Sequence, residues 1–161
     1  MTATNQLDHL LAKLPKVRGD LITNANLAKL TWFRVGGPAE ILFRPADEMD
    51  LIEFLKKLPK KVPVTILGLG SNTLVRDGGI PGVSIRLGKA FRKITVNDQT
   101  VIAGAGVGNL KLANVARENS LTGMEFLSGI PGGLGGSIRM NAGAFDGEVK
   151  DIVKSVSAIT R

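Results

Sequence analysis

The sequence predicts a fold that mixes α-helices with β-strands, and three stretches support this prediction. Residues 40–67 give the pattern of a strand, a helix and a second strand, which is a β-α-β unit. Residues 94–103 predict a β-hairpin, and residues 109–119 predict an amphipathic helix. A chain of 161 residues, 43% of them hydrophobic, can build the core of one typical domain or of two small lobes.

The N-terminal segment predicts a helix, because four leucines recur at helical spacing before Pro15. These leucines are Leu7, Leu10, Leu11 and Leu14. We expect residues 1–27 to form a helical lead on the surface of the main body. His9, the only histidine, lies among these leucines, and we interpret it as a surface or boundary residue rather than as a catalytic base.

Residues 28–88 carry the β-α-β unit. A strand begins at Glu40 and Pro45 stops it, and Asp47 and Asp50 then stand where a helix N-cap and its third-position acid belong. The apolar face of this helix comprises Leu51, Phe54, Leu55 and Leu58. Residues 62–67 predict a short buried strand, and turns at 77–79 and 81–82 precede a further strand over 83–87.

Residues 89–161 begin with the hairpin, whose turn is residues 97–99. Asn109 is suited to capping the helix that follows, because asparagine is among the favoured N-cap residues. Residues 151–160 predict a new strand. We expect this part of the fold to be incomplete at its C-terminus.

The stretch Ser128–Asn141 contains five glycines, which ordinary core packing does not require. Residues 68–72 and 104–108 are glycine-rich in the same way. Close approach of bare backbone to a phosphate or to a flat cofactor ring is a common reason for such loops. Any one loop is as well explained by a tight turn between strands, but three loops together favour a binding site.

Two well-known nucleotide fingerprints are absent. The only Gly-Lys pair, Gly88-Lys89, precedes an alanine, so there is no Walker phosphate loop. The Rossmann pattern lacks its third glycine in both candidate loops, because Asn109 and Thr73 stand in that position. Residues 70–72 still suit an anion, because consecutive backbone N–H groups lie beside small polar side chains. Ser137 and Asn141 offer similar groups.

Composition excludes several kinds of chemistry. The chain has no cysteine and no tyrosine, and its carboxylates show no metal-ligand clustering. We therefore expect no metal and no catalytic residue within this chain, so a bound cofactor must supply the reactivity. The net charge is +7, but the cations are scattered and aromatic residues are few, so we do not expect nucleic-acid binding. No apolar run is long enough for a membrane span and no secretory signal is visible, so we expect a cytoplasmic protein.

Four motifs, taken in order, resemble the UDP-N-acetylenolpyruvoylglucosamine reductase family. They occupy residues 31–39 (Thr-Trp-Phe-Arg-Val-Gly-Gly-Pro-Ala), 67–79, 123–136 and 140–144 (Met-Asn-Ala-Gly-Ala). The resemblance runs from about residue 28 to the end of the chain. Two departures occur, because Trp32 stands where the family often has threonine and Phe145-Asp146 replaces a frequent Tyr-Gly.

The resemblance implies an α+β FAD-binding module of the vanillyl-alcohol-oxidase/p-cresol-methylhydroxylase type, with a small α/β lobe over 28–88, a second lobe over 89–161 and the flavin between them. The pyrophosphate would lie in a loop of seven residues, Gly68, Leu69, Gly70, Ser71, Asn72, Thr73 and Leu74. The isoalloxazine and ribityl parts would lie against Ile130, Pro131, Gly132, Gly135, Gly136, Ser137, Asn141, Ala142, Gly143 and Ala144.

The family's reaction, again by resemblance, uses NADPH to reduce the flavin and then reduces the enolpyruvyl double bond of a UDP-sugar. The product is UDP-N-acetylmuramate for peptidoglycan. The family's catalytic serine, glutamate and arginine have no counterpart here, and the substrate domain is absent, so this chain alone is expected to bind FAD without turnover. The alternative is a stand-alone flavin-binding subunit of another oxidoreductase, such as a molybdenum hydroxylase.

Overall fold

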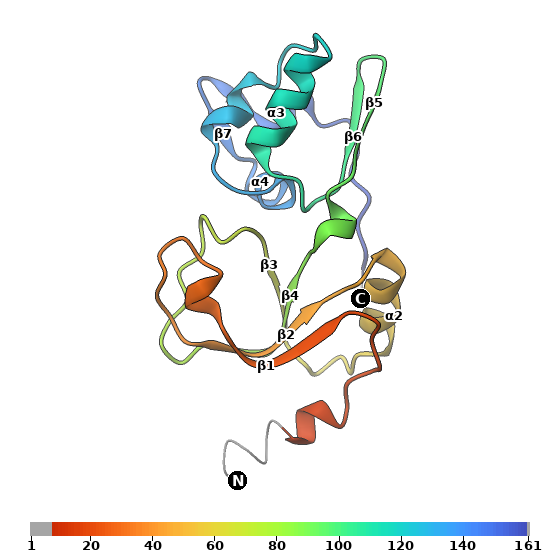
Figure 1. The fold of residues 1–161 in the computed structure, drawn as a ribbon, viewed down its shortest axis with the longest axis vertical. Helices are drawn as coiled ribbons and strands as arrows, with labels where there is room; N and C mark the ends of the chain where they lie inside the picture. Colours follow the sequence, from red (N-terminus) through yellow and green to blue (C-terminus); the bar gives the residue numbers. More distant parts are fainter. Residues whose placement is uncertain (1–7, 161) are drawn as a thin grey trace. The chain divides into compact units, whose positions relative to one another are not determined.

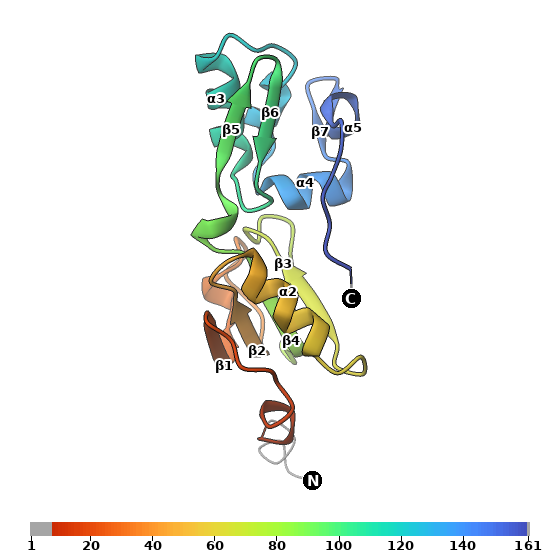
Figure 2. The ribbon, with the colours of Figure 1, turned by 90° about the vertical axis from the view of Figure 1, so that its right-hand side faces the viewer.

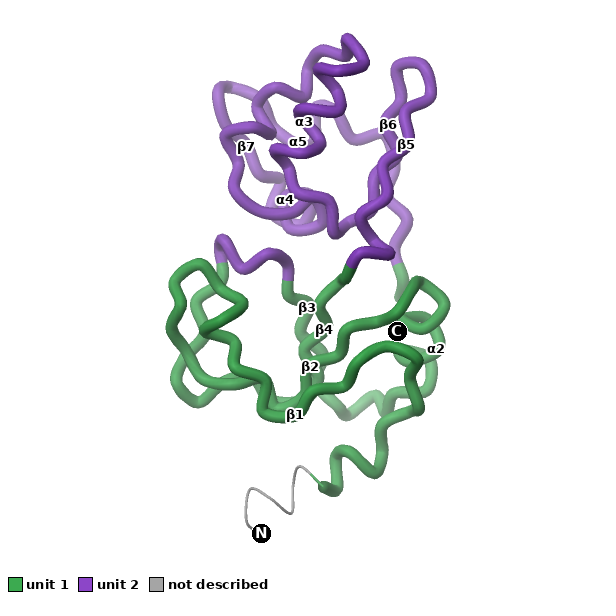
Figure 3. Tube along the Cα trace, viewed as in Figure 1, with its two compact units in different colours: residues 1–67, 73–88, 159–161 green, residues 68–72, 89–158 purple. Residues whose placement is uncertain are grey.

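A computed structural model describes residues 8–160, which form two compact units (Figure 3). Of the described residues, the first unit contains 8–67, 73–88 and 159–160. The second unit contains residues 68–72 and 89–158. The glycine loop 68–72 is therefore separated from the strands on either side of it and belongs with the C-terminal half.

The first unit is built on a four-stranded mixed sheet (Figure 1). The strand order is β1 (Asp20–Asn26), β2 (Pro38–Arg44), β4 (Ile80–Arg86) and β3 (Val64–Leu67). β1 pairs antiparallel with β2, whereas β2 and β3 both pair parallel with β4. β2, one of the two inner strands, carries three consecutive residues that are fully buried, 41–43, as expected for a strand covered on both faces.

Helix α2 (Glu48–Lys57) connects β2 to β3 and packs on one face of this sheet (Figure 2). Phe54 of α2 lies against Phe43 of β2, with ring centroids 4.2 Å apart. Asp47 is the N-cap, and its carboxylate accepts from the N–H of Asp50 at 2.9 Å. The predicted strand, cap and helix are thus confirmed.

Asp50 has a second role that its position in the helix did not predict. Its buried carboxylate, 5% exposed, accepts hydrogen bonds from the backbone N–H groups of Arg18, Gly19 and Ala46, each at 2.9 Å. Burial alone would raise the pKa of Asp50, but these hydrogen bonds and the charge of Arg18 hold that pKa below its ordinary value. The carboxylate therefore fastens the segment before β1 to the start of α2.

The structure differs from the expected helical lead. Residues 8–11 are helical, but β1 occupies residues 20–26 and a short 3-10 helix, η1 (Leu27–Lys29), follows it. The expected helix positions before residue 8, including Leu7, lie outside the described residues. β1 forms because β2 offers a partner edge for antiparallel pairing, an interaction that local leucine spacing cannot reveal.

The expected turn at Pro81-Gly82 is instead part of β4. The register between β2 and β4 shifts at this point, which is the mark of a bulge. Gly82 adopts a φ of +73° and donates its N–H to the carboxylate of Glu40 at 2.6 Å. The proline and glycine therefore bend the strand without ending it.

The second unit surrounds a separate apolar core. The hairpin of β5 (Ile94–Asn97) and β6 (Thr100–Ala103) is confirmed and leads to α3 (Asn109–Glu118). Two short helices follow, η3 (Glu125–Gly129) and α4 (Leu134–Met140). The buried core residues are Val107, Leu112, Phe126, Leu127, Leu134 and Val149.

The end of the second unit contains a very short hairpin, β7 (Gly143–Ala144) and β8 (Gly147–Glu148), and then α5 (Val149–Ile152). The hairpin turn places Phe145 and Asp146 at φ +50° and +63°, a region that favours glycine. The expected strand over 151–160 is wrong, because α5 extends to residue 152 and residues 153–160 pair with no strand of the described chain. Among residues 8–160, every helix is too short or too polar to cross a membrane.

Candidate cofactor-binding site

The three glycine-rich loops meet in the second unit. Leu134 and Gly135 donate their backbone N–H groups to the carbonyls of Val107 and Ala105, at 2.8 and 2.9 Å. Ser71 donates its hydroxyl to the carbonyl of Pro131 at 3.0 Å. Segments that lie as far as 60 positions apart in the sequence are thereby joined by direct hydrogen bonds, so the loops form one surface.

Several glycines of the central motif are needed for packing alone. A Cβ on Gly135 would lie 2.9 Å from the Cβ of Ala105, and a Cβ on Gly129 would lie 2.4 Å from the ring of Phe145. Gly132 combines a φ of +125° with a Cβ position 2.7 Å from the Ser71 hydroxyl. These glycines allow backbones and side chains of the same unit to approach closely, which requires no ligand.

Gly136 is different, because nothing lies within 4 Å of a Cβ added there. Its φ is not in the left-handed region, so neither packing nor conformation excludes a side chain. Gly68 has the same open surroundings. Gly136 lowers the stability of α4 and no neighbouring atom requires it, so we interpret the open space beside it as space for a ligand.

The backbone of Gly70, Ser71 and Asn72 is suited to an anion. Gly70 adopts a φ of +76°, and none of the three N–H groups donates to a backbone acceptor in the described part of the chain. Consecutive N–H groups around a left-handed residue form a concave nest that binds phosphate oxygens. The residues present therefore fit the pyrophosphate of a dinucleotide cofactor, with no lysine or arginine required.

The carbonyls of the Ile-Pro-Gly segment hold the motif in place. Asn109 donates its backbone N–H to Gly132 O at 3.1 Å, and its side-chain Nδ2 donates to Ile130 O at 3.1 Å. The same Nδ2 donates to the hydroxyl of Ser137 at 2.7 Å. Asn109 was expected as the cap of α3, but Gly108 is the N-cap and the Asn109 side chain makes no capping bond. The cap prediction is therefore wrong, because Asn109 instead makes three hydrogen bonds to the central motif.

Asn141 ends α4 in the left-handed region, at φ +46°. Its side chain is engaged within the unit, because Nδ2 donates to Glu148 at 2.6 Å and Oδ1 accepts from the Lys150 N–H at 2.9 Å. Hydrogen bonds from Lys150 and Asn141 hold the pKa of Glu148 below its ordinary value, and Glu148 raises the pKa of Lys150. Both polar atoms of the Asn141 side chain are therefore held by β8 and α5.

The remaining predicted residues are placed as follows. The Ala142 N–H donates to Ser137 O at 2.9 Å, and residues 143 and 144 are paired in β7. Leu69 lies 3.6 Å from where a Cβ on Gly133 would be. Thr73 and Leu74 belong to the first unit, where Leu74 is exposed.

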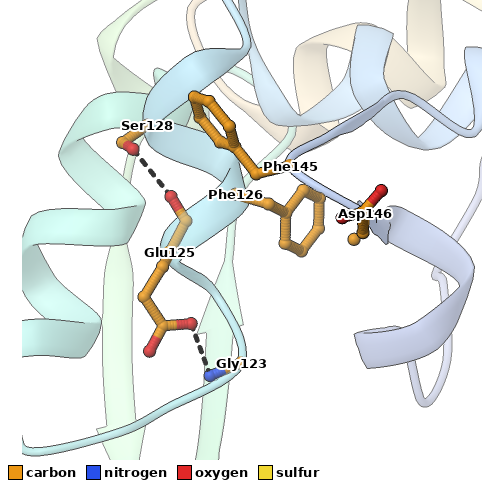
Figure 4. Close-up of a pocket in the computed structure, with 7 residues that line it drawn as sticks. Gly123, Glu125, Phe126, Ser128, Phe145 and Asp146 are labelled. Carbon is orange, nitrogen blue, oxygen red and sulfur yellow. Dashed lines mark hydrogen bonds between the residues drawn. The ribbon is translucent and has the colours of Figure 1, made fainter.

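A separate open hollow lies on the second unit, between η3 and the β7–β8 turn (Figure 4). Two of its polar side chains bond within η3 and the segment before it, because Glu125 accepts from the Gly123 N–H and Ser128 donates to Glu125 O, both at 2.7 Å. Phe145, at its rim, is 79% exposed. The hollow contains none of the predicted cofactor residues.

Side-chain chemistry is sparse at the glycine surface. Within residues 8–160, no group of three or more histidine, aspartate or glutamate side chains could hold a metal ion. The side chains whose hydrogen bonds link these loops are the hydroxyls and amides of Ser71, Asn109 and Ser137. Backbone N–H groups, hydroxyls and amides of this kind can bind and orient a cofactor, so the surface is that of a cofactor-binding α+β module.

Comparison with known proteins identifies the cofactor. Residues 39–161 match the FAD binding domain family. The chain therefore belongs to the FAD-binding domain family, and FAD is the cofactor that the family binds.

Individual relatives show which kind of FAD-binding protein this chain is similar to. The chain is 55% identical over 152 residues to the UDP-N-acetylenolpyruvoylglucosamine reductase of Azorhizobium caulinodans, covering 94% of this chain and 49% of the relative. It is 54% identical over 162 residues to a protein of the same name from Methylorubrum extorquens, covering 100% of this chain and 52% of the relative. The chain spans about half the length of these relatives.

A crystal structure of the corresponding reductase from Thermus caldophilus matches with a TM-score of 0.64 and 36% identity. The match covers 83% of this chain and 46% of that one. The resemblance to this reductase family and the α+β fold class are thereby confirmed.

Proposed function

We propose that this chain is the FAD-binding portion of an NADPH-dependent reductase that converts UDP-N-acetylenolpyruvoylglucosamine to UDP-N-acetylmuramate, a precursor of peptidoglycan. Sequence identity of 54–55% to reductases of that name supports the assignment. The structural observation that carries it is the glycine surface, where the free N–H groups of residues 70–72 and the open position at Gly136 lie in one unit.

The chain's own residues bind and orient the cofactor. The N–H groups of Gly70, Ser71 and Asn72 would hold the pyrophosphate. Gly136 and Ser137 would meet the flavin or its ribityl chain, where bare backbone allows a flat ring to lie close. Bound FAD supplies hydride transfer between NADPH and the enolpyruvyl double bond, chemistry that the side chains of this surface do not provide.

We further propose that the chain alone does not turn over. The chain spans about half of these relatives, and we assign the residues that bind the UDP-sugar and protonate the substrate to the part that it does not span. NADPH and the UDP-sugar are partners of the longer protein only. The proposal includes a cytoplasmic location, with which the lack of cysteine agrees.

Turnover tests this assignment. The purified chain, saturated with FAD, is mixed with NADPH and UDP-N-acetylenolpyruvoylglucosamine, and product is measured by chromatography. We expect no UDP-N-acetylmuramate from this chain and steady turnover from a full-length relative assayed in parallel. Product formation by this chain alone would contradict the proposed division of roles.

A further inference from the structure

The hydroxyl of Ser137 has an unused proton. Ser137 is 4% exposed, and its oxygen accepts a hydrogen bond from Asn109 Nδ2 at 2.7 Å. No acceptor for its own proton is found among residues 8–160. A buried hydroxyl donor without an acceptor is unfavourable, so the free protein leaves a donor ready for another molecule.

The chemistry of Asn109 fixes the direction of this hydrogen bond. Nδ2 also lies 3.1 Å from the carbonyl oxygen of Ile130, which can only accept. The amide nitrogen must therefore face both Ile130 and Ser137, and Ser137 must act as the acceptor. The Ser137 proton is consequently turned away from Asn109.

A purely structural role does not account for this side chain. The backbone N–H of Asn109 already ties α3 to the central motif through Gly132 O at 3.1 Å. The side chain belongs to a residue only 1% exposed, and its Oδ1 is buried without a partner in the described chain. An unpaired buried acceptor is a cost, which a group kept only for packing would avoid.

We propose that Asn109 is a positioning residue for FAD: by donating to Ser137 Oγ, it directs the Ser137 hydroxyl proton to an acceptor on the bound cofactor. The inference rests on the proposed function, because it requires FAD at the glycine surface. Gly136, where an added Cβ would meet nothing within 4 Å, directly precedes Ser137 in α4, so both residues lie in the turn of helix that we assign to the cofactor.

A double-mutant cycle with FAD as the probe tests this role. Asn109→Asp keeps the shape of the side chain but can only accept at ordinary pH, so the Ser137 proton would turn toward it. Ser137→Ala removes the hydroxyl. We expect either change to weaken FAD binding by the loss of one hydrogen bond, about 3- to 10-fold in Kd. The double variant should bind FAD no more weakly than whichever single variant has the higher Kd.

Asn119→Asp is the matched control, because Asn119 lies at the other end of α3 and its Nδ2 bonds to Val115 O of the same helix. We expect its Kd for FAD to equal that of the unaltered chain. The visible spectrum of bound FAD should shift in the same direction in Asn109→Asp and Ser137→Ala, and thermal unfolding without FAD reports folding separately.

The outcomes are distinct. Additive losses in the double variant would show that Asn109 acts through the fold alone and would overturn the proposal. If Asn109→Asp does not fold, Ser137→Ala decides, because normal FAD binding by that variant also overturns it. If the unaltered chain binds FAD and both variants bind it equally well, only this inference is refuted. If the unaltered chain itself leaves the FAD spectrum unchanged, the proposed function is refuted as well.

Discussion

Replacing Gly136 by alanine should make the free protein more stable and FAD binding weaker. The position lies in α4, and an added Cβ meets nothing within 4 Å. Alanine in a helix is favoured over glycine by about 0.5–1 kcal/mol, so the unfolding free energy should rise by that amount. For a chain of 161 residues this corresponds to about 1–4 °C in Tm.

The same methyl group occupies the space that we assign to the cofactor. Overfilling a packed contact costs about 1–3 kcal/mol, which is roughly 5- to 150-fold in Kd for FAD. Gly135→Ala is the matched control, since its Cβ would lie 2.9 Å from that of Ala105 and should lower Tm instead. Thermal unfolding without ligand and fluorescence titration with FAD measure the two effects. A Gly136→Ala chain that binds FAD as tightly as the unaltered chain would refute our interpretation of this position.

Three further predictions concern other parts of the chain. Asp50→Asn should lower the unfolding free energy by about 1–3 kcal/mol in urea titrations, because an amide cannot accept all three N–H donors that the carboxylate accepts. Because the pKa of Asp50 is lower in the folded than in the unfolded protein, the charged carboxylate stabilises the fold above the unfolded pKa, and this stabilisation is lost as the pH falls through the folded pKa. The urea midpoint of the unaltered chain should therefore fall more steeply in acid than that of Asp50→Asn. Equal slopes for the two chains would contradict this. Asp146→Gly should stabilise the chain by up to about 1 kcal/mol and so raise Tm, because residue 146 has a φ of +63°; an unchanged or lower Tm would argue against strain there. Gly70→Ala should cost about 1–2 kcal/mol and weaken FAD binding, because Gly70 has a φ of +76°, and unaltered affinity would exclude the nest as the pyrophosphate site.

The parts of the fold that the sequence predicted are those with local signals. Asp47 caps α2 because the signal is contained in one turn of chain, and the β5–β6 hairpin forms around a short polar turn. β1 was missed because its strand conformation comes from pairing with β2, a separate strand further along the chain. Residues 153–160 have a composition typical of a strand, but they have no partner strand in the described chain. The strand predicted from this composition therefore does not form there.

The site was predictable as a set of loops but not residue by residue. Glycine content marked all three loops, yet the sequence cannot distinguish Gly135, which is needed for contact with Ala105, from Gly136, which has open surroundings. Asn109 has the local features of a helix cap, and its actual side-chain contacts lie 21 and 28 residues away. Phe145 and Asp146 lie in a left-handed turn, at φ +50° and +63°, which the side-chain pattern alone does not reveal.

The most direct test of this account is an equilibrium titration of the unaltered chain with FAD, followed by the visible spectrum and by Tm. We predict a saturable shift of the flavin spectrum and a rise in Tm, equivalent to about 2.7 kcal/mol when free FAD is one hundred times Kd. A flavin spectrum and a Tm that both remain unchanged at saturating FAD would contradict the claim that the glycine surface of the second unit binds this cofactor.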